Sequence, residues 1–448
     1  MSLRTVPGSN QQYHLISYDA SGAEVPDADG SSASAAALAA LAGPAPGVTD
    51  VFILSHGWQG DLDDAIWQYD SWIGAANPDT SADAISPFLI GLHWPSKAWS
   101  DRELKATPSG LLGGGPDPAD AITVERAVDE YAVLLGGSRD ARAALATVLA
   151  FAAGIDPERT AGRSDRLPGD VVAAYRTLAR GAGGDGDSPL LGESWDAARA
   201  FAQATAGEGG NGGLLGDGLF ARLREAVLAP LRQLTFWHSK DQARVFGEGG
   251  AAGLLRAVMA RCDARVHLMG HSFGTIVVSG AVRGPGPLPA PPPRPVSSMF
   301  LVQGAVSLWA FAPEVPAGVG GGRGYFADVV GPSFVRGPIV ATRSQWDYAV
   351  GKYYPLAVGL ANQYLLGGDL PKFGGIGAFG IQGTGAVELP PLVSGQLPRP
   401  DLAPGTVYNV DGSAVIATLS GAGGAHTDLA HPELSWLAWS AAQAAARG

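Results

Sequence analysis

The stretch that most constrains the fold spans residues 265–278. Residues 265–270 (Arg-Val-His-Leu-Met-Gly) are apolar enough for a buried strand, and residues 274–278 (Gly-Thr-Ile-Val-Val) are typical of an apolar helix. The turn between them reads Gly-His-Ser-Phe-Gly. Because its two glycines lack a Cβ, strand and helix can pass close together and hold Ser272 in a strained turn with its hydroxyl pointing outwards. The order strand, turn, helix predicts that Ser272 is a nucleophile.

The five-residue pattern G-x-S-x-G carries little weight by itself. A chain with 64 glycines and 31 serines among 448 residues is expected to contain it by chance about 0.6 times. It occurs once, directly after a strand-like run. The prediction of a nucleophile therefore depends on this setting.

The same kind of apolar run recurs along the chain. Helical spacing fills the gaps between these runs, for example at residues 61–76 and 433–446, and an N-terminal hairpin is expected at residues 15–25. The strand-like runs are residues 51–54, 87–94, 265–270, 298–302, 338–341 and 406–410. Strands that alternate with helices predict an α/β protein, with a mainly parallel sheet covered by helices on both faces.

Residues 97–245 interrupt this alternation with helical stretches only. A connection of this length is far beyond the usual two to six residues between a strand and a helix. We therefore expect a core made of residues 1–96 and 246–448 and an inserted helical subdomain, which we interpret as a cap over the site. The alternative is a set of extra helices packed on the side of the sheet.

The composition of the chain argues against some classes of binding partner and some cellular locations. The net charge is −12 and no run of Lys or Arg is present, which argues against nucleic acid as a partner. No 18 apolar residues run together and the start lacks a signal-peptide pattern, so we expect neither stable membrane insertion nor secretion. The single cysteine, Cys262, excludes an intramolecular disulfide. Together these features predict a soluble, cytoplasmic protein. The sequence makes no prediction of oligomeric state.

A serine nucleophile needs a base, and the base needs an acid to orient it. His426 lies in a glycine-rich loop beyond the last expected strand and is the preferred base; His431, directly before a proline, is the alternative. Asp347 ends the loop that follows the strand at 338–341 and is the preferred acid. Glu314, in the loop after the strand at 298–302, is the alternative acid.

Two backbone amides are expected to stabilise an oxyanion. Phe273 follows the nucleophile and supplies one. The early strand at 51–54 runs into Ser-His-Gly-Trp, which places the amide of Trp58 as the second donor. No metal is expected: His426 and His431 have a possible ligand spacing, but neither a third ligand nor an H-E-x-x-H order accompanies them.

These residues together resemble the α/β-hydrolase superfamily, whose chain order is oxyanion loop, serine, acid, histidine. Segments 236–247, 301–305 and 342–347 are similar to uncharacterised bacterial members, and the likeness covers residues 48–96 and 236–445. The resemblance implies hydrolysis of a carboxylic ester or related acyl compound through an acyl-enzyme intermediate, without metal or organic cofactor.

The resemblance implies a type of reaction but does not identify the substrate. A carboxylesterase acting on a small or medium acyl compound is the main expectation. A lipase or phospholipase is the alternative, since the insert and aromatic residues such as Trp94 and Trp237 could line an acyl channel. An amidase or a cofactor-free haloperoxidase would share the same triad. A non-catalytic interaction protein built on a hydrolase fold is the remaining hypothesis.

Overall fold

The chain divides into two compact units. The structure, a computed structural model, describes residues 3–42, 47–58, 62–75, 85–96, 124–135, 137–154, 166–182, 196–206, 217–353, 365–366, 370–371, 374–420 and 423–447. The first unit consists of Met1–Ser96, Gln242–Pro355 and Asn362–Gly448. The second consists of Lys97–Asp241 and Leu356–Ala361. Every residue proposed for the site from the sequence belongs to the first unit.

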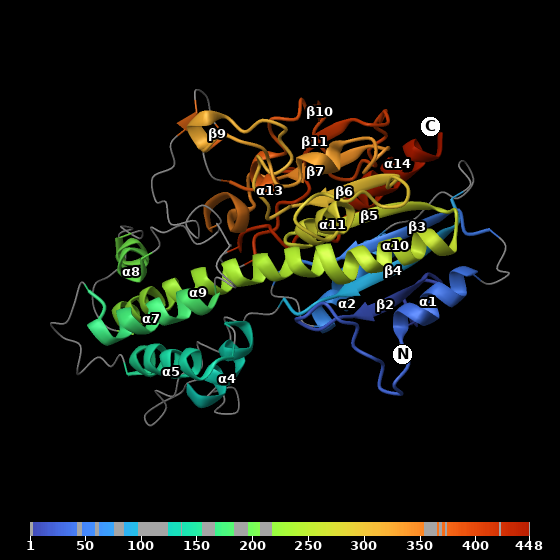
Figure 1. The fold of residues 1–448 in the computed structure, drawn as a ribbon. Helices are drawn as coiled ribbons and strands as arrows, with labels where there is room; N and C mark the ends of the chain where they lie inside the picture. Colours follow the sequence, from blue (N-terminus) through green and yellow to red (C-terminus); the bar gives the residue numbers. More distant parts are fainter. Residues whose placement is uncertain are drawn as a thin grey trace. The chain divides into compact units, whose positions relative to one another are not determined.

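A nine-stranded sheet forms the centre of the first unit, in the order β1-β2-β4-β3-β5-β6-β7-β11-β10 (Figure 1). Strand β1 pairs antiparallel with β2, and every other neighbouring pair in this sheet is parallel. The strands are β1 (Leu3–Thr5), β2 (Gln12–Ser17), β3 (Asp50–Ser55), β4 (Pro87–His93), β5 (Arg265–His271), β6 (Ser298–Val302), β7 (Ile339–Arg343), β10 (Val387–Leu389) and β11 (Val407–Asp411). The prediction of a mainly parallel α/β sheet is confirmed.

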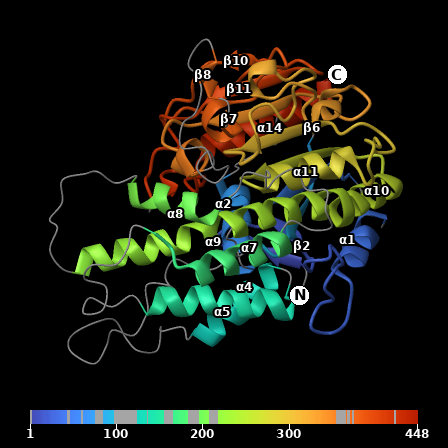
Figure 2. The same cartoon turned by 60° about the vertical axis from the view of Figure 1, so that its left-hand side comes forward.

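Helices pack around this sheet (Figures 1 and 2). Helix α11 (Gly274–Arg283) packs on β5 and β3, and α10 (Ala252–Arg261) packs against α11 and α1 (Ala33–Ala42). Helix α14 (Pro432–Arg447) packs on β5, β6 and β7 and against α2 (Leu62–Ala75). The aromatic and aliphatic side chains of α2 and α14 recur at helical spacing, which gives each helix one apolar face for the sheet.

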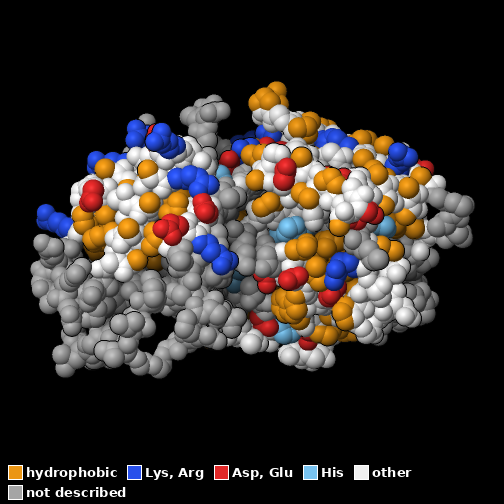
Figure 3. Space-filling view, turned by 90° about the horizontal axis from the view of Figure 1, so that it is seen from below, with side chains coloured by type: hydrophobic (Ala, Val, Ile, Leu, Met, Phe, Trp, Pro, Cys, Tyr) orange, Lys and Arg blue, Asp and Glu red, His pale blue; other side chains and the backbone are white. Residues whose placement is uncertain are grey.

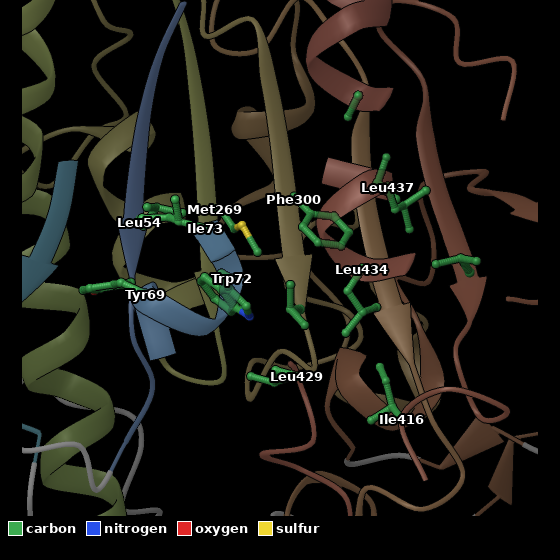
Figure 4. Packing of buried hydrophobic residues seen from close by; sticks show 14 of the residues in the cluster. Leu54, Tyr69, Trp72, Ile73, Met269, Phe300, Ile416, Leu429, Leu434 and Leu437 are labelled. Atoms are coloured by element: carbon green, nitrogen blue, oxygen red, sulfur yellow. The ribbon is translucent and has the colours of Figure 1, made fainter. Parts of the chain in front are cut away.

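The main core lies between the sheet and helices α2 and α14 (Figure 4). Alternate residues of neighbouring strands supply one side, including Leu54, Met269 and Phe300. Trp72 and Leu434 are among the residues that the helices supply. At the other end of this layer, the ring of Phe52 stacks on Trp439 with centroids 5.4 Å apart. Burial of these side chains fixes the register of the strands, because a shift by one residue would turn each of them to the opposite face.

The chain reverses at residues 15–25 as the hairpin prediction expects: the N–H of Val25 donates to the carbonyl oxygen of Ser17, and Tyr18 and Glu24 form an antiparallel bridge. This reversal is a short extension beyond β2, and a fuller antiparallel pairing, between β1 and β2, lies ahead of the predicted segment. Asp19 closes the turn, since its carboxylate accepts the backbone N–H groups of Ser21 and Ala23.

The described part of the second unit is helical. Helix α5 packs between α4 and α7, and α7 also contacts α8. Helix α9 contains Pro230 and continues beyond Asp241 into residues of the first unit. The helices are α4 (Val124–Leu134), α5 (Arg139–Ala153), α7 (Gly169–Ala182), α8 (Ala197–Ala206) and α9 (Asp217–Phe246). Whether this unit serves as a cap stays a prediction.

The molecular surface mixes side chains of different kinds. On the face shown in Figure 3, acidic and basic side chains lie among apolar and uncharged ones. Within the described ranges, no helix is both long enough and apolar enough to cross a membrane.

A buried charge cluster ties β3 to β5 where these strands begin. Asp50 is fully buried, and its carboxylate accepts two hydrogen bonds from the Arg265 guanidinium at 2.7 Å each and one from His267 Nε2 at 2.8 Å. His267 Nδ1 lies 2.8 Å from Ser298 Oγ. Burial alone would raise the pKa of Asp50, but the hydrogen bonds from His267, Arg265 and Thr49 bring it below its ordinary value. Ser298, His267 and Asp50 thus form a Ser-His-Asp array separate from the predicted Ser272, His426 and Asp347, and this array links β3, β5 and β6.

Removing the acceptor of this cluster should destabilise the fold. Asp50→Ala leaves the buried His267 and the Arg265 guanidinium without their shared carboxylate, and breaking a buried ion pair costs about 3 to 5 kcal/mol. We expect the free energy of unfolding to fall by about 3 kcal/mol in urea denaturation at pH 7.

The pH dependence has a definite sign. The pKa of Asp50 is lower in the folded state, so its stabilisation is complete above the unfolded value near 3.8 and is lost as pH falls through the folded pKa. The gap between the wild-type protein and Asp50→Ala should therefore close only in this acid range. Asp328→Ala, which breaks an exposed pair with Arg323, is the control and should cost less than about 1 kcal/mol. Equal losses in the two variants would contradict this interpretation.

Candidate active site

The turn after β5 holds Ser272 in a left-handed backbone conformation, with φ of +54°. A Cβ on Gly274 would lie 2.3 Å from the carbonyl oxygen of Ser55, and a Cβ on Gly270 would lie 2.4 Å from that of Gly274. Both distances are too short for any other residue. The glycines are therefore required because the start of α11 packs directly against the ends of β3 and β5, as the sequence pattern indicates.

Hydrogen bonds to the neighbouring strand maintain this conformation. The N–H of Ser272 donates to the carbonyl oxygen of Val302 at the end of β6, at 3.1 Å. The carbonyl oxygen of Ser272 accepts from the Thr275 hydroxyl at 2.6 Å and from the N–H of Ala305 at 3.1 Å. The backbone at Ser272 is satisfied on both sides, so its strained φ is offset by fixed contacts.

Ser272, His426 and Asp347 form a continuous hydrogen-bonded chain. His426 Nε2 lies 2.8 Å from Ser272 Oγ, and His426 Nδ1 lies 2.9 Å from Asp347 Oδ2. Because a carboxylate accepts, Nδ1 carries the proton, and Nε2 is left to accept from the serine hydroxyl. Asp347 is fully buried and the side chain of His426 is 14% exposed. The three side chains come from the ends of β5 and β7 and from the loop after β11.

The loop that carries His426 is attached to the turn that carries Asp347. Asp347 and Gly424 form an antiparallel bridge, and the N–H of Ala425 donates to the carbonyl oxygen of Trp346 at 2.8 Å. The second carboxylate oxygen of Asp347 accepts the N–H of Val350 at 3.0 Å. The backbone thus fixes the spacing between base and acid.

The alternative residues lie elsewhere. Glu314 is exposed in the loop after β6, whereas Asp347 occupies the position next to His426 Nδ1. His431 donates from Nε2 to Asp428 Oδ1 at 2.9 Å, and the other oxygen of Asp428 accepts the N–H groups of Ala417 and Thr418. His431 therefore helps to hold the histidine loop.

The loop after β3 passes directly beside Ser272. A Cβ on Gly57 would lie 2.6 Å from the Cβ of Ser272. His56 orients this loop: its Nε2 accepts the N–H of Trp94 at 3.2 Å, so its Nδ1 carries the proton and donates to the carbonyl oxygen of Gly57 at 2.8 Å. Trp58 follows, and its ring lies 5.8 Å from that of Phe273, centroid to centroid. Trp58 and Phe273, the residues whose amides are the predicted donors, thus lie close to each other and next to residues of the Ser272 turn.

Two residues in this region were missed as site components by sequence reasoning. His271 donates from Nε2 to the backbone carbonyl of His426 at 3.0 Å, and burial, with the nearby His426 ring, lowers the pKa of His271 far below its ordinary value. His271 is therefore neutral at neutral pH. Gln303, at the end of β6, has φ of +44° and donates to Asp347 Oδ2. The only sequence signal for either was a polar residue at the end of a buried strand.

A search for metal-binding groups gives no candidate in the parts of the chain described by the structure: no three His, Cys, Asp or Glu side chains gather there in a way that could hold an ion. Comparison of the chain with family models, with curated proteins and with solved structures finds no match. The geometry of the site is therefore the basis for assigning a function.

The close contact at Gly274 yields a test of the turn. In Gly274→Ala the added Cβ meets backbone oxygens of Ser55 and His56, which cannot move aside without separating α11 from β3. We expect a loss of at least ~2 kcal/mol, seen as a lower thermal midpoint.

Gly253→Ala is the matched control, since Gly253 lies in α10 and an added Cβ there meets no atom within 4 Å. Alanine is favoured over glycine inside a helix, so this variant should be as stable as the wild-type protein or up to ~1 kcal/mol more stable. A tolerated Gly274→Ala would show that the turn does not need this contact.

Proposed function

We propose that this protein is a serine hydrolase of the α/β-hydrolase type that cleaves a carboxylic ester through an acyl-enzyme intermediate. The observation that carries the proposal is the hydrogen-bonded chain from Ser272 Oγ through His426 to Asp347. A serine in a strained strand-to-helix turn, followed in the chain by the acid and then the histidine, is the arrangement expected of such enzymes.

The proposed first step is attack of Ser272 Oγ on the acyl carbon while its proton passes to His426 Nε2. Asp347 accepts from His426 Nδ1 and stabilises the imidazolium that forms. His426 then gives the proton to the alkoxide leaving group, and an alcohol departs. In the second half, His426 takes a proton from water, the hydroxide attacks the acyl-enzyme, and Ser272 regains its proton as the acid leaves.

Charge on the tetrahedral intermediate needs donors beside the serine. The backbone N–H groups of Trp58 and Phe273 are assigned this role. The contact of Gly57 with Ser272 and the closeness of the Trp58 and Phe273 rings support it. Each such donor is worth roughly 10²- to 10³-fold in rate. His56 holds the loop in place through the carbonyl of Gly57.

The nucleophile is tested by reaction with a fluorophosphonate probe. The wild-type protein should be labelled, and Ser272→Ala should not be, because the probe forms a covalent bond with an activated serine. Ser298→Ala removes the serine of the second Ser-His-Asp array and should leave labelling unchanged. Ser298 is the matched control because it also lies 2.8 Å from a histidine nitrogen, but it is at the start of β6, whereas Ser272 follows the end of β5. Loss of labelling in Ser298→Ala alone would overturn the assignment.

The acid is tested by comparing Asp347→Asn with Glu314→Gln. An asparagine next to Nδ1 favours the wrong tautomer of His426, so kcat on p-nitrophenyl acetate should fall by about 10⁴-fold in Asp347→Asn. Glu314→Gln changes an exposed side chain and should retain wild-type turnover. Loss of turnover in Glu314→Gln alone would instead assign the acid to Glu314, in the loop after β6.

The substrate class within this proposal is a small or medium acyl ester. A lipase, an amidase and a non-catalytic protein stay as alternatives. Turnover of p-nitrophenyl esters of increasing chain length separates an esterase from a lipase, and a panel of amides tests for an amidase. A folded protein with neither turnover nor fluorophosphonate labelling would favour the non-catalytic alternative. The cytoplasmic location also stays a prediction from composition.

A further inference from the structure

Gln303 stands out among the described residues because it is buried, polar and held in a left-handed backbone conformation, with φ of +44°. Ser272 is the other non-glycine residue described with a positive φ. The two lie at the ends of adjacent strands and are linked through the Ser272 N–H and the carbonyl oxygen of Val302. Strain of this kind costs roughly 1–3 kcal/mol and persists where surrounding contacts require it.

The side-chain amide of Gln303 faces the oxygen of Asp347 that His426 uses. Gln303 Nε2 lies 2.9 Å from Asp347 Oδ2 and 3.0 Å from the carbonyl oxygen of Gly377. Both partners are acceptors, so they take the two protons of the amide nitrogen. Asp347 Oδ2 thus receives one hydrogen bond from Gln303 and one from His426 Nδ1.

Thr342 on β7 holds the oxygen end of this amide. Its hydroxyl donates to Gln303 Oε1 at 2.9 Å and accepts the backbone N–H of Gln303 at 3.0 Å. A flipped amide would turn its oxygen towards the carboxylate and the carbonyl, neither of which has a proton to donate, and would lose both of those bonds. With its backbone in the left-handed conformation, Gln303 reaches Asp347 and Gly377 with one end of its amide and Thr342 with the other.

We propose that Gln303 is a positioning residue for the reaction: it holds the carboxylate of Asp347 in the orientation that keeps His426 aligned on Ser272. This inference rests on the proposed serine hydrolase function. Gln303 is fully buried, and among the described residues of the triad its side chain bonds to Asp347, so we expect it to act on turnover and not on substrate binding.

The test compares Gln303→Met and Gln303→Glu with the wild-type protein on p-nitrophenyl acetate. Methionine has similar length but no donors, so kcat should fall by roughly 10- to 100-fold with KM changed by less than about twofold. Gln382→Met is the matched control, because Gln382 donates to the backbone carbonyl of Phe379 and has no bond to Asp347 in the structure. It should keep the wild-type kcat.

Gln303→Glu adds a readout that a space-filling role would not produce. Its new carboxyl takes the place of the amide, against Asp347 Oδ2, and two carboxyl groups at ~3 Å resist being ionised together. The pair therefore keeps one proton at acid and neutral pH, and the new group can still donate to Asp347; two negative charges repel only once the pH is high enough to remove that last proton. The pH profile of kcat should therefore gain an additional fall on the alkaline side.

Three outcomes decide the matter. Lower kcat in Gln303→Met with the altered profile in Gln303→Glu supports the proposal. Wild-type kcat in Gln303→Met, or an unchanged profile in Gln303→Glu, overturns it while fluorophosphonate labelling of Ser272 still supports the hydrolase. A wild-type protein that is neither labelled nor active overturns both. Should Gln303→Met fail to fold, as judged by its thermal midpoint, the profile of Gln303→Glu decides alone.

Discussion

The close approach of α11 to the carboxyl end of β3 is the contact on which the site depends. Gly274 packs against the carbonyl oxygens of Ser55 and His56, so the helix begins where the neighbouring strand ends. This contact brings the loop with Gly57 and Trp58 against Ser272 and forces the left-handed turn that presents the serine. The positions of the proposed nucleophile and of the proposed oxyanion donors therefore depend on one packing constraint.

Around this contact, the site is built from backbone pairing and buried polar groups. The acid turn and the histidine loop are joined by a bridge between Asp347 and Gly424, and Gln303 and Thr342 hold the acid from the neighbouring strands. Such a network holds its side chains rigidly, because the buried polar atoms that form it have hydrogen-bond partners. The Asp50 cluster at the opposite end of the sheet uses the same residue types to join strands. Residue type alone does not distinguish the two arrays; their places on the sheet do.

Much of this arrangement could be predicted from the sequence. Buried parallel strands appear as short apolar runs, so β3, β4, β5, β6, β7 and β11 were all expected within about one residue at most ends. Ser272, His426 and Asp347 were found because their chain order matches a known geometry. The short strands β1 and β10 were not, since each has three mostly exposed residues and so forms no apolar run. Gln303 could not be assigned either, because neither its φ nor its contact with Asp347, 44 positions later, is encoded in any local pattern.

The central claim is that Ser272 forms a covalent acyl-enzyme. The most direct measurement is mass spectrometry of the protein quenched in acid during turnover of p-nitrophenyl acetate, followed by peptide mapping. The proposal predicts a mass increase of one acetyl group, carried by the peptide that contains Ser272, which disappears once the substrate is exhausted. Turnover without any adduct, or an adduct confined to another residue, would contradict it.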